Sequence, residues 1–109
     1  MSIDPIALGK EMLDTTKDIL TDDWGNYRGV LSAQTAAIAS QAVEIEKLSD
    51  EGVLNDQNAE VYRGMIRDLV NGLKWLLVGL AILTIEKIIN AIMDLLKTAL
   101  NTALGWTFL

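Results

Sequence analysis

The side chains best suited to chemistry in this chain of 109 residues are carboxylates, because it contains neither histidine nor cysteine. The missing histidines remove the commonest general base and the commonest metal ligand. The missing cysteines remove disulfides, thiolate metal sites and cysteine nucleophiles. The acids near the middle of the chain are not spaced to share one helix face beside a nucleophile: Glu44, Glu46, Glu51, Asp56 and Glu60.

A second acidic feature is the pair Asp22-Asp23, which could bind a cation weakly. A good calcium loop needs six or more oxygen ligands, so a solvated turn is the better interpretation of this pair. We therefore expect no enzyme activity, no cofactor, no metal site and no small-molecule substrate.

The charges divide the chain into two parts. Residues 1–68 carry six Lys or Arg and thirteen Asp or Glu, whereas residues 69–109 carry three Lys and two acids. An acidic front followed by a nearly neutral apolar back indicates a two-part design. Binding to nucleic acid needs clustered cations that displace counterions, and the sequence has no such cluster. We expect no nucleic-acid partner.

The periodicity predicts an all-α fold that opens with two helices. Asp4 followed by Pro5 is a favourable helix start, and the apolar spacing after it predicts a short amphipathic helix over 5–20. A break is expected over 21–26. A second helix is predicted over 27–49, where Leu31, Ile38 and Ile45 recur every seven residues, as on one face of a bundle helix or in a coiled coil.

The rest of the chain predicts one long helix over 57–104, with a kink or division near Gly72 or near Glu86. Because the loop before it is short, the second and third helices should form an antiparallel helical hairpin. This gives three regions: an N-terminal amphipathic helix in 1–23, an Ala-rich helix and turn in 24–56, and a long apolar C-terminal helix in 57–109.

The most apolar segment is 75–85, which has no charged residue. A run of this length is typical of a buried core helix, whereas spanning a bilayer takes about 20 apolar residues. Two alternatives follow for the C-terminal helix. It is partly transmembrane, with a span over about 69–93, or it is deeply buried in protein. Because 69–85 is apolar on nearly all sides, we favour the membrane.

Polar and small residues of the predicted long helix fall on one stripe when each residue advances by about 100°. Such a stripe suits contacts between subunits or the lining of a lumen, since small residues allow close approach and polar groups avoid lipid. The same stripe would also suit the solvated face of a helix packed on a core. Its residues are Asp68, Gly72, Gly79, Glu86, Asn90, Asp94, Lys97 and Asn101.

Three residues are candidates for anchors at a membrane interface. Lys74 lies on the apolar side of the predicted helix, where its long side chain could reach the headgroups, and Trp75 is its neighbour. Trp106 near the C-terminus could act in the same way. The cations that precede the span favour a cytoplasmic position for the N-terminal region.

In layout, with a charged helical front, an apolar segment and an amphipathic tail, the chain resembles small phage or bacterial proteins that oligomerise in membranes, such as holins and virion ejection components. The resemblance covers the layout alone, so no residue role is transferred. It implies a homo-oligomeric membrane protein with a structural or pore-forming role, located in a virion or host membrane if viral, and a larger protein assembly as a further partner. The alternative is a soluble helical assembly or adaptor subunit that buries its C-terminal helix against partner chains.

Overall fold

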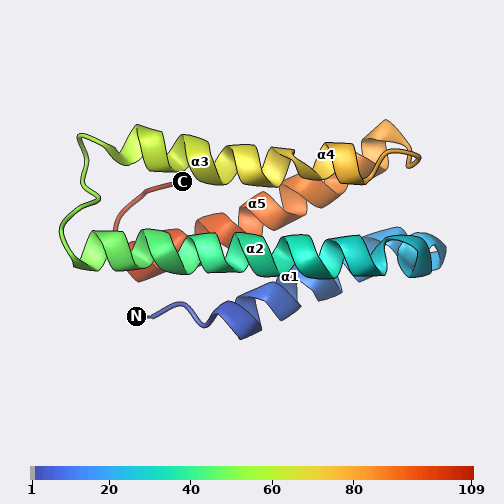
Figure 1. The fold of residues 1–109 in the computed structure, drawn as a ribbon, viewed down its shortest axis with the longest axis horizontal. Coiled ribbons are helices and arrows are strands. Elements are labelled where there is room, and N and C mark those ends of the chain that lie inside the picture. Colours follow the sequence, from blue (N-terminus) through green and yellow to red (C-terminus); the bar gives the residue numbers. More distant parts are fainter. Residues whose placement is uncertain (1) are drawn as a thin grey trace.

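The computed structural model describes residues 2–109, and this range contains helices and no strand, so the all-α prediction is confirmed. The molecule is elongated, with extents of 44 × 23 × 18 Å, and its main helices run roughly along the long axis (Figure 1). The elements in chain order are α1 (Pro5–Leu20), the 3-10 turn η1 (Thr21–Asp23), α2 (Trp24–Asp50), α3 (Ala59–Asn71), α4 (Leu73–Leu76) and α5 (Ile82–Leu104).

Helix α1 begins and ends where the sequence predicts. The Asp4 carboxylate accepts hydrogen bonds from the backbone N–H groups of Ile6 (3.0 Å) and Ala7 (3.2 Å), and Pro5 occupies the first helical position. The helix ends before Thr21, whose φ of 50° is incompatible with a continuing α-helix.

Helix α2 begins earlier than predicted, at Trp24 instead of residue 27, because η1 leads directly into it. Its predicted seven-residue seam is confirmed as part of the core, since Leu31, Ile38 and Ile45 are fully buried. The seam packs inside this chain's own bundle, as on the face of an ordinary bundle helix. Gly52, with a φ of 76°, follows the end of the helix.

The connection from α2 to α3 is held by local hydrogen bonds. Asn55 Oδ1 accepts from the N–H of Gln57 (2.9 Å), and Asn58 donates from its side-chain amide to the Val53 carbonyl (2.7 Å). Leu54 is buried beneath this loop. Helix α3 then lies beside α2 (Figure 1), and the Gln34 side chain donates to the Leu69 carbonyl at 3.3 Å.

The predicted continuous helix over 57–104 is wrong. The chain divides at Gly72, as anticipated, but it also reverses direction in a turn over 77–81, so that α5 packs back against α1, α2, α3 and α4 (Figure 1). Gly79 has a φ of 109°, a conformation that costs glycine much less than residues with a side chain. The reversal brings the apolar residues on both sides of it to one core.

The predicted span over 69–93 is consequently distributed over three helices and a turn. Within residues 2–109, none of the helices combines the length and the apolar character needed to cross a bilayer.

Helix α5 supplies a full side of the core. Ile88, Ile92, Leu96 and Leu100 are fully buried and recur at helical spacing. They meet the buried residues of α1, α2 and α3, among them Met12, Ile38 and Ile66. The apolar face of α5 is therefore already covered within one copy of the chain.

The C-terminal tail folds back over the end of α5 after Gly105, whose φ is 81°. The Asn101 Oδ1 atom accepts hydrogen bonds from the N–H groups of Phe108 (2.8 Å) and Leu109 (2.9 Å). Phe108 is buried, and its carbonyl accepts from Arg63 Nε at 2.6 Å, while the Arg63 guanidinium lies 5.6 Å from the Phe108 ring centroid. The tail thus ties α3 to α5.

We expect Asn101→Ala to lower the free energy of unfolding by about 1–2 kcal/mol, because two backbone donors lose their acceptor. The measurement is urea unfolding followed by circular dichroism. Asn90→Ala, at an exposed position of the same helix, serves as the matched control and should change stability by less than about 0.5 kcal/mol. Equal effects of the two substitutions would contradict the role of Asn101 in holding the tail.

Candidate functional site

The acidic side chains do not form a metal centre in the part of the chain that the structure describes: within residues 2–109, no three of them come together as ligands. Asp22 and Asp23 lie exposed in η1. Glu46 is buried, and its carboxylate accepts a hydrogen bond from the N–H of Ile3 at 2.8 Å. Glu60 pairs with Arg63 and, at 3.9 Å, with Arg67 on the surface of α3. The contacts of Glu46 and Glu60 are structural.

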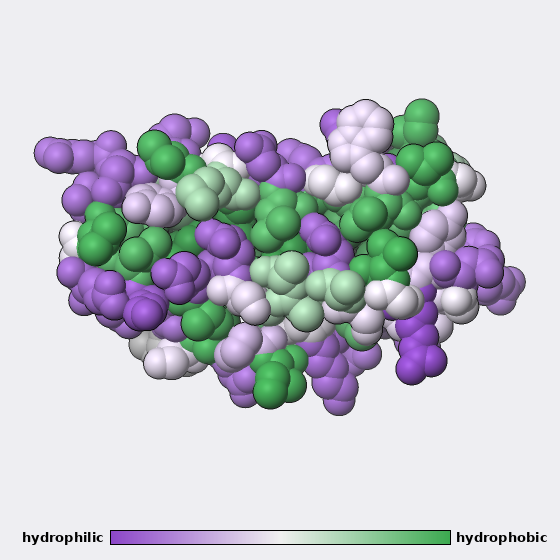
Figure 2. Space-filling view, viewed as in Figure 1, coloured by the Kyte–Doolittle hydropathy of each residue, from purple (hydrophilic) through white to green (hydrophobic). Residues whose placement is uncertain are grey.

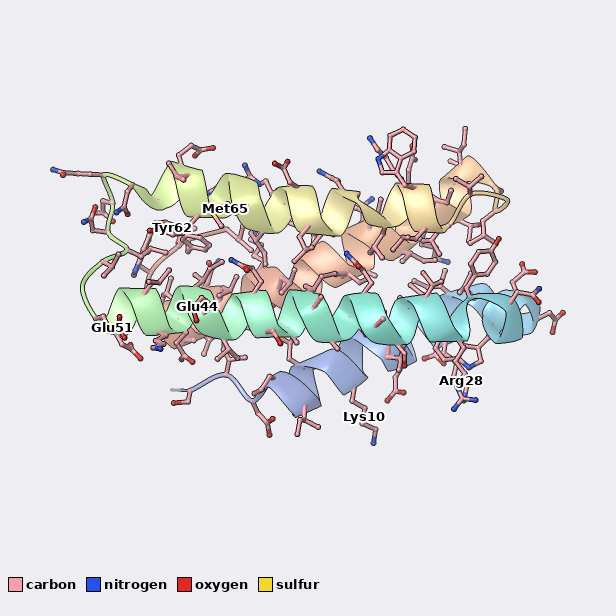
Figure 3. The ribbon with its side chains drawn as sticks, in the orientation of Figure 1. Lys10, Arg28, Glu44, Glu51, Tyr62 and Met65 are labelled. Carbon is pink, nitrogen blue, oxygen red and sulfur yellow. The ribbon has the colours of Figure 1, made fainter. Side chains whose placement is uncertain are left out.

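Two open grooves flank α1. One, of about 280 Å³, lies between α1 and α5, and the other, of about 440 Å³, lies between α1 and α2. Their walls are mainly small apolar residues with a few hydroxyl groups. The charged residues along them are Asp4 and Glu11 in the first groove and Lys10 in the second, whose side chain extends into solvent (Figure 3). Neither groove gathers groups for acid–base or nucleophilic chemistry.

The most unusual surface is an apolar tip, defined here as residues 74–83, at the end of the bundle where the chain passes from α4 to α5. Figure 2 shows apolar residues at this end of the molecule, as well as along the rest of the face in view. Large apolar side chains protrude on both sides of the turn: Trp75 is 72% exposed, Val78 69%, Ile82 73% and Leu83 79%. All four lie within residues 75–83, and apolar side chains that gather on the surface of a folded chain are typical of a site of interaction.

The tip is held by contacts with the rest of the bundle. Leu73 and Leu77 are fully buried and fix α4 to the core. The residues between them, 74–76, are exposed. The Tyr27 hydroxyl at the start of α2 donates a hydrogen bond to the Val78 carbonyl at 3.2 Å. A Cβ atom on Gly79 would lie only 3.0 Å from the same hydroxyl oxygen. The exposed side chains therefore project from an ordered turn.

The tip contains one charged residue and no acid. Lys74 is the only charged residue between Leu69 and Ile85, in a chain of formal net charge −6. Its Nζ atom lies 5.2 Å from the centroid of the Trp75 ring, within the range of a cation–π interaction. Electrostatically, the tip differs from the acid-rich remainder of the surface.

The predicted polar stripe is divided by the reversal of the chain. Angles on a helical wheel hold only along a continuous helix, and the helix used to draw the stripe is interrupted at Gly72 and again at 77–81. Asp68 is exposed on α3, Gly72 joins α3 to α4, and Gly79 lies in the turn. The members on α5 remain on one side of that helix: Glu86, Asn90, Asp94 and Lys97 are exposed, and Asn101 is half-buried under the tail.

The structure separates the three predicted anchors. Lys74 and Trp75 are both exposed at the tip. Trp106 is partly buried in the segment after α5, at the opposite end of the bundle (Figure 1), and packs edge-on against Phe108 with 5.6 Å between ring centroids.

Sequence reasoning missed most of the residues that form and hold the tip. Val78, Ile82 and Leu83 lie in the apolar run that was assigned to a continuous helix, and Gly79 inside this run was the available signal for a turn. The contact from Tyr27 joins residues 51 positions apart and leaves no local pattern in the sequence.

We expect Gly79→Ala to lower the free energy of unfolding by about 1–3 kcal/mol, because it places a side chain at positive φ and against Tyr27. Gly64→Ala is the matched control, since Gly64 lies inside α3 with open space around it, and it should raise stability by about 0.5–1 kcal/mol. Thermal unfolding of both variants tests the difference in sign. A stabilised Gly79→Ala variant would contradict the geometry of the turn.

Comparison of the chain with models of protein families, with curated proteins and with solved structures finds no match.

Proposed function

We propose that this chain is a non-enzymatic helical structural protein that attaches to a membrane as a homo-oligomer, as a component of a larger assembly. The observation that carries the proposal is the apolar tip, because it exposes Trp75, Val78, Ile82 and Leu83 at one end of a bundle whose other helices have a well-buried core. Sites of interaction with lipid or protein are the usual reason for such a patch.

Self-association is supported by the outward face of α2. Small residues dominate this face, so a helix of a second copy could approach closely. Ile6 of α1, which is almost fully exposed, borders it along the groove between α1 and α2. The exposed small residues of α2 are Gly29, Ser32, Ala33, Ala36, Ala37 and Ser40.

The alternative is a soluble assembly or adaptor subunit whose apolar surface is covered by a partner chain. The burial of α5 within one copy of the chain determines which surface is left for such a partner. Ile88, Ile92 and Leu96 on α5 already pack inside the bundle, so a partner would cover the tip instead of α5. In that case the tip would be the core of a protein interface.

The test is flotation of the expressed full-length chain in a density gradient, since membranes float whereas aggregates sediment. We expect the chain to float with the membranes, and light scattering after extraction in mild detergent should give a discrete oligomer. Recovery as a discrete oligomer without detergent and without membranes would favour the assembly subunit. A detergent-free monomer would contradict both functions.

A further inference from the structure

We propose that the tip inserts into the outer acyl-chain region of a phospholipid surface, with Lys74 and Trp75 at the level of the headgroups, and that apolar burial rather than charge attraction drives attachment. This inference rests on the proposed membrane association and specifies its surface, its partner and its driving force.

The apolar side chains at the tip are arranged for insertion. Trp75 precedes the turn over 77–81, Val78 lies within it, and Ile82 and Leu83 follow it. All four side chains are at least 69% exposed. Each gains free energy when its surface leaves water, roughly in proportion to the apolar area removed. They project from a chain reversal at the end of the bundle (Figure 1), and such a convex shape can enter lipid without a matching cavity in a partner.

The tip is already ordered before it meets a surface. The hydrogen bond from Tyr27 to the Val78 carbonyl and the burial of Leu77 hold the turn in place. Binding therefore does not have to order a flexible loop, which would otherwise reduce the affinity.

Several backbone groups of the turn are also paired, as a shallow position in lipid requires. The N–H of Leu80 donates to the Leu77 carbonyl at 3.1 Å, and the Val78 carbonyl accepts from Tyr27. The Ala81 carbonyl accepts from the N–H groups of Thr84 and Ile85, at 3.0 and 3.1 Å. These are the first helical bonds of α5, whose N-terminus has no side-chain cap.

The charges around the tip fit a phospholipid headgroup. Lys74 can extend its ammonium toward phosphate while its aliphatic part stays with the apolar residues, and an indole ring such as that of Trp75 prefers the membrane interface. No carboxylate lies between Leu69 and Ile85, and the exposed acids at the same end of the bundle are Asp22 and Asp23 of η1, in the connection from α1 to α2 (Figure 1). Arg28 emerges from the side of α2 that faces away from α4 (Figure 3), which leaves Lys74 as the cation of the tip.

The charge of the whole chain argues against an electrostatic attachment. A formal net charge of −6 repels an anionic surface, and a single lysine does not reverse this repulsion. Salt screens interactions between exposed charges beyond about 10 Å at 0.1 M. Raising the salt concentration should therefore leave attachment intact, and anionic lipid should not be required.

The experiment is flotation of the purified full-length chain with phosphatidylcholine vesicles, and with vesicles in which part of this lipid is replaced by phosphatidylglycerol, at low and high NaCl. We expect binding to both vesicles and no release by salt. Val78→Asp and Leu83→Asp should each lower the partition coefficient by roughly tenfold or more, because a charge is placed among the inserting residues.

Val61→Asp is the matched control for Val78→Asp. It makes the same chemical change at a position of similar exposure, 65%, but on α3 outside the tip. We expect its partition coefficient to stay within about twofold of the unchanged chain. Circular dichroism of the three variants should confirm that each remains folded, as expected for substitutions at exposed positions.

Trp75 fluorescence gives an independent measure of position. The emission should shift to shorter wavelength on vesicles and be quenched by lipids brominated near the headgroup end of the acyl chain. Trp75→Phe should lose most of both effects, because Trp24 and Trp106 are partly buried in the bundle. Quenching that persists in Trp75→Phe would overturn the proposed orientation.

The outcomes separate the inference from the proposed function. If the unchanged chain floats but Val78→Asp, Leu83→Asp and Val61→Asp all float equally well, membrane association stands and the tip is not its site. If salt releases the chain, or if only anionic vesicles bind it, the apolar driving force is wrong. If no vesicle binds it, the inference and the membrane function both fail, and a protein partner becomes the occupant of the tip.

Discussion

The reversal of the chain over 77–81 is the constraint on which the rest of the structure depends. It requires a positive φ at Gly79, and it is fixed by Leu77 in the core and by the hydrogen bond from Tyr27. Because of this turn, α5 returns along the other helices and covers their apolar faces with its own. Without it, Ile88, Ile92, Leu96 and Leu100 of α5 could not reach the core that they share with α1, α2 and α3.

The local parts of the fold follow from the sequence, whereas the reversal does not. The Asp4-Pro5 start and the seam of Leu31, Ile38 and Ile45 each depend on residues close together in the chain, and the structure confirms them. Gly79 looked the same as a glycine tolerated inside a helix. Its conformation depends on whether the chain has the lower free energy with α5 packed on α1 and α2 or with α5 continuing α4. Local periodicity carries no information about that difference in free energy.

The same limit explains which parts of the candidate site were accessible to sequence reasoning. Lys74 and Trp75 could be selected because a cation next to an indole is a local signal. Asn101 was placed on a polar stripe by its angle alone, but its side chain instead binds the backbone of Phe108 and Leu109. This use of Asn101 depends on Gly105 turning the chain back, and a helical wheel cannot represent a residue that bonds to the segment beyond the helix end.

The apolar residues of the segment 69–85 therefore fall into a buried group and an exposed group, which a hydropathy profile of the sequence does not separate. Part of its apolar surface belongs to the core, through Val70, Leu73 and Leu77, and part of it is exposed at the tip. A run selected for burial alone would have mostly polar outward positions, as in α1 and α3, where exposed Asp, Glu, Lys and Arg outnumber the exposed large apolar residues Ile6, Val61 and Met65. Over 75–83, by contrast, every exposed position is apolar or glycine, in a chain of formal net charge −6. That pattern favours an apolar partner for the tip and makes chance exposure a poor explanation.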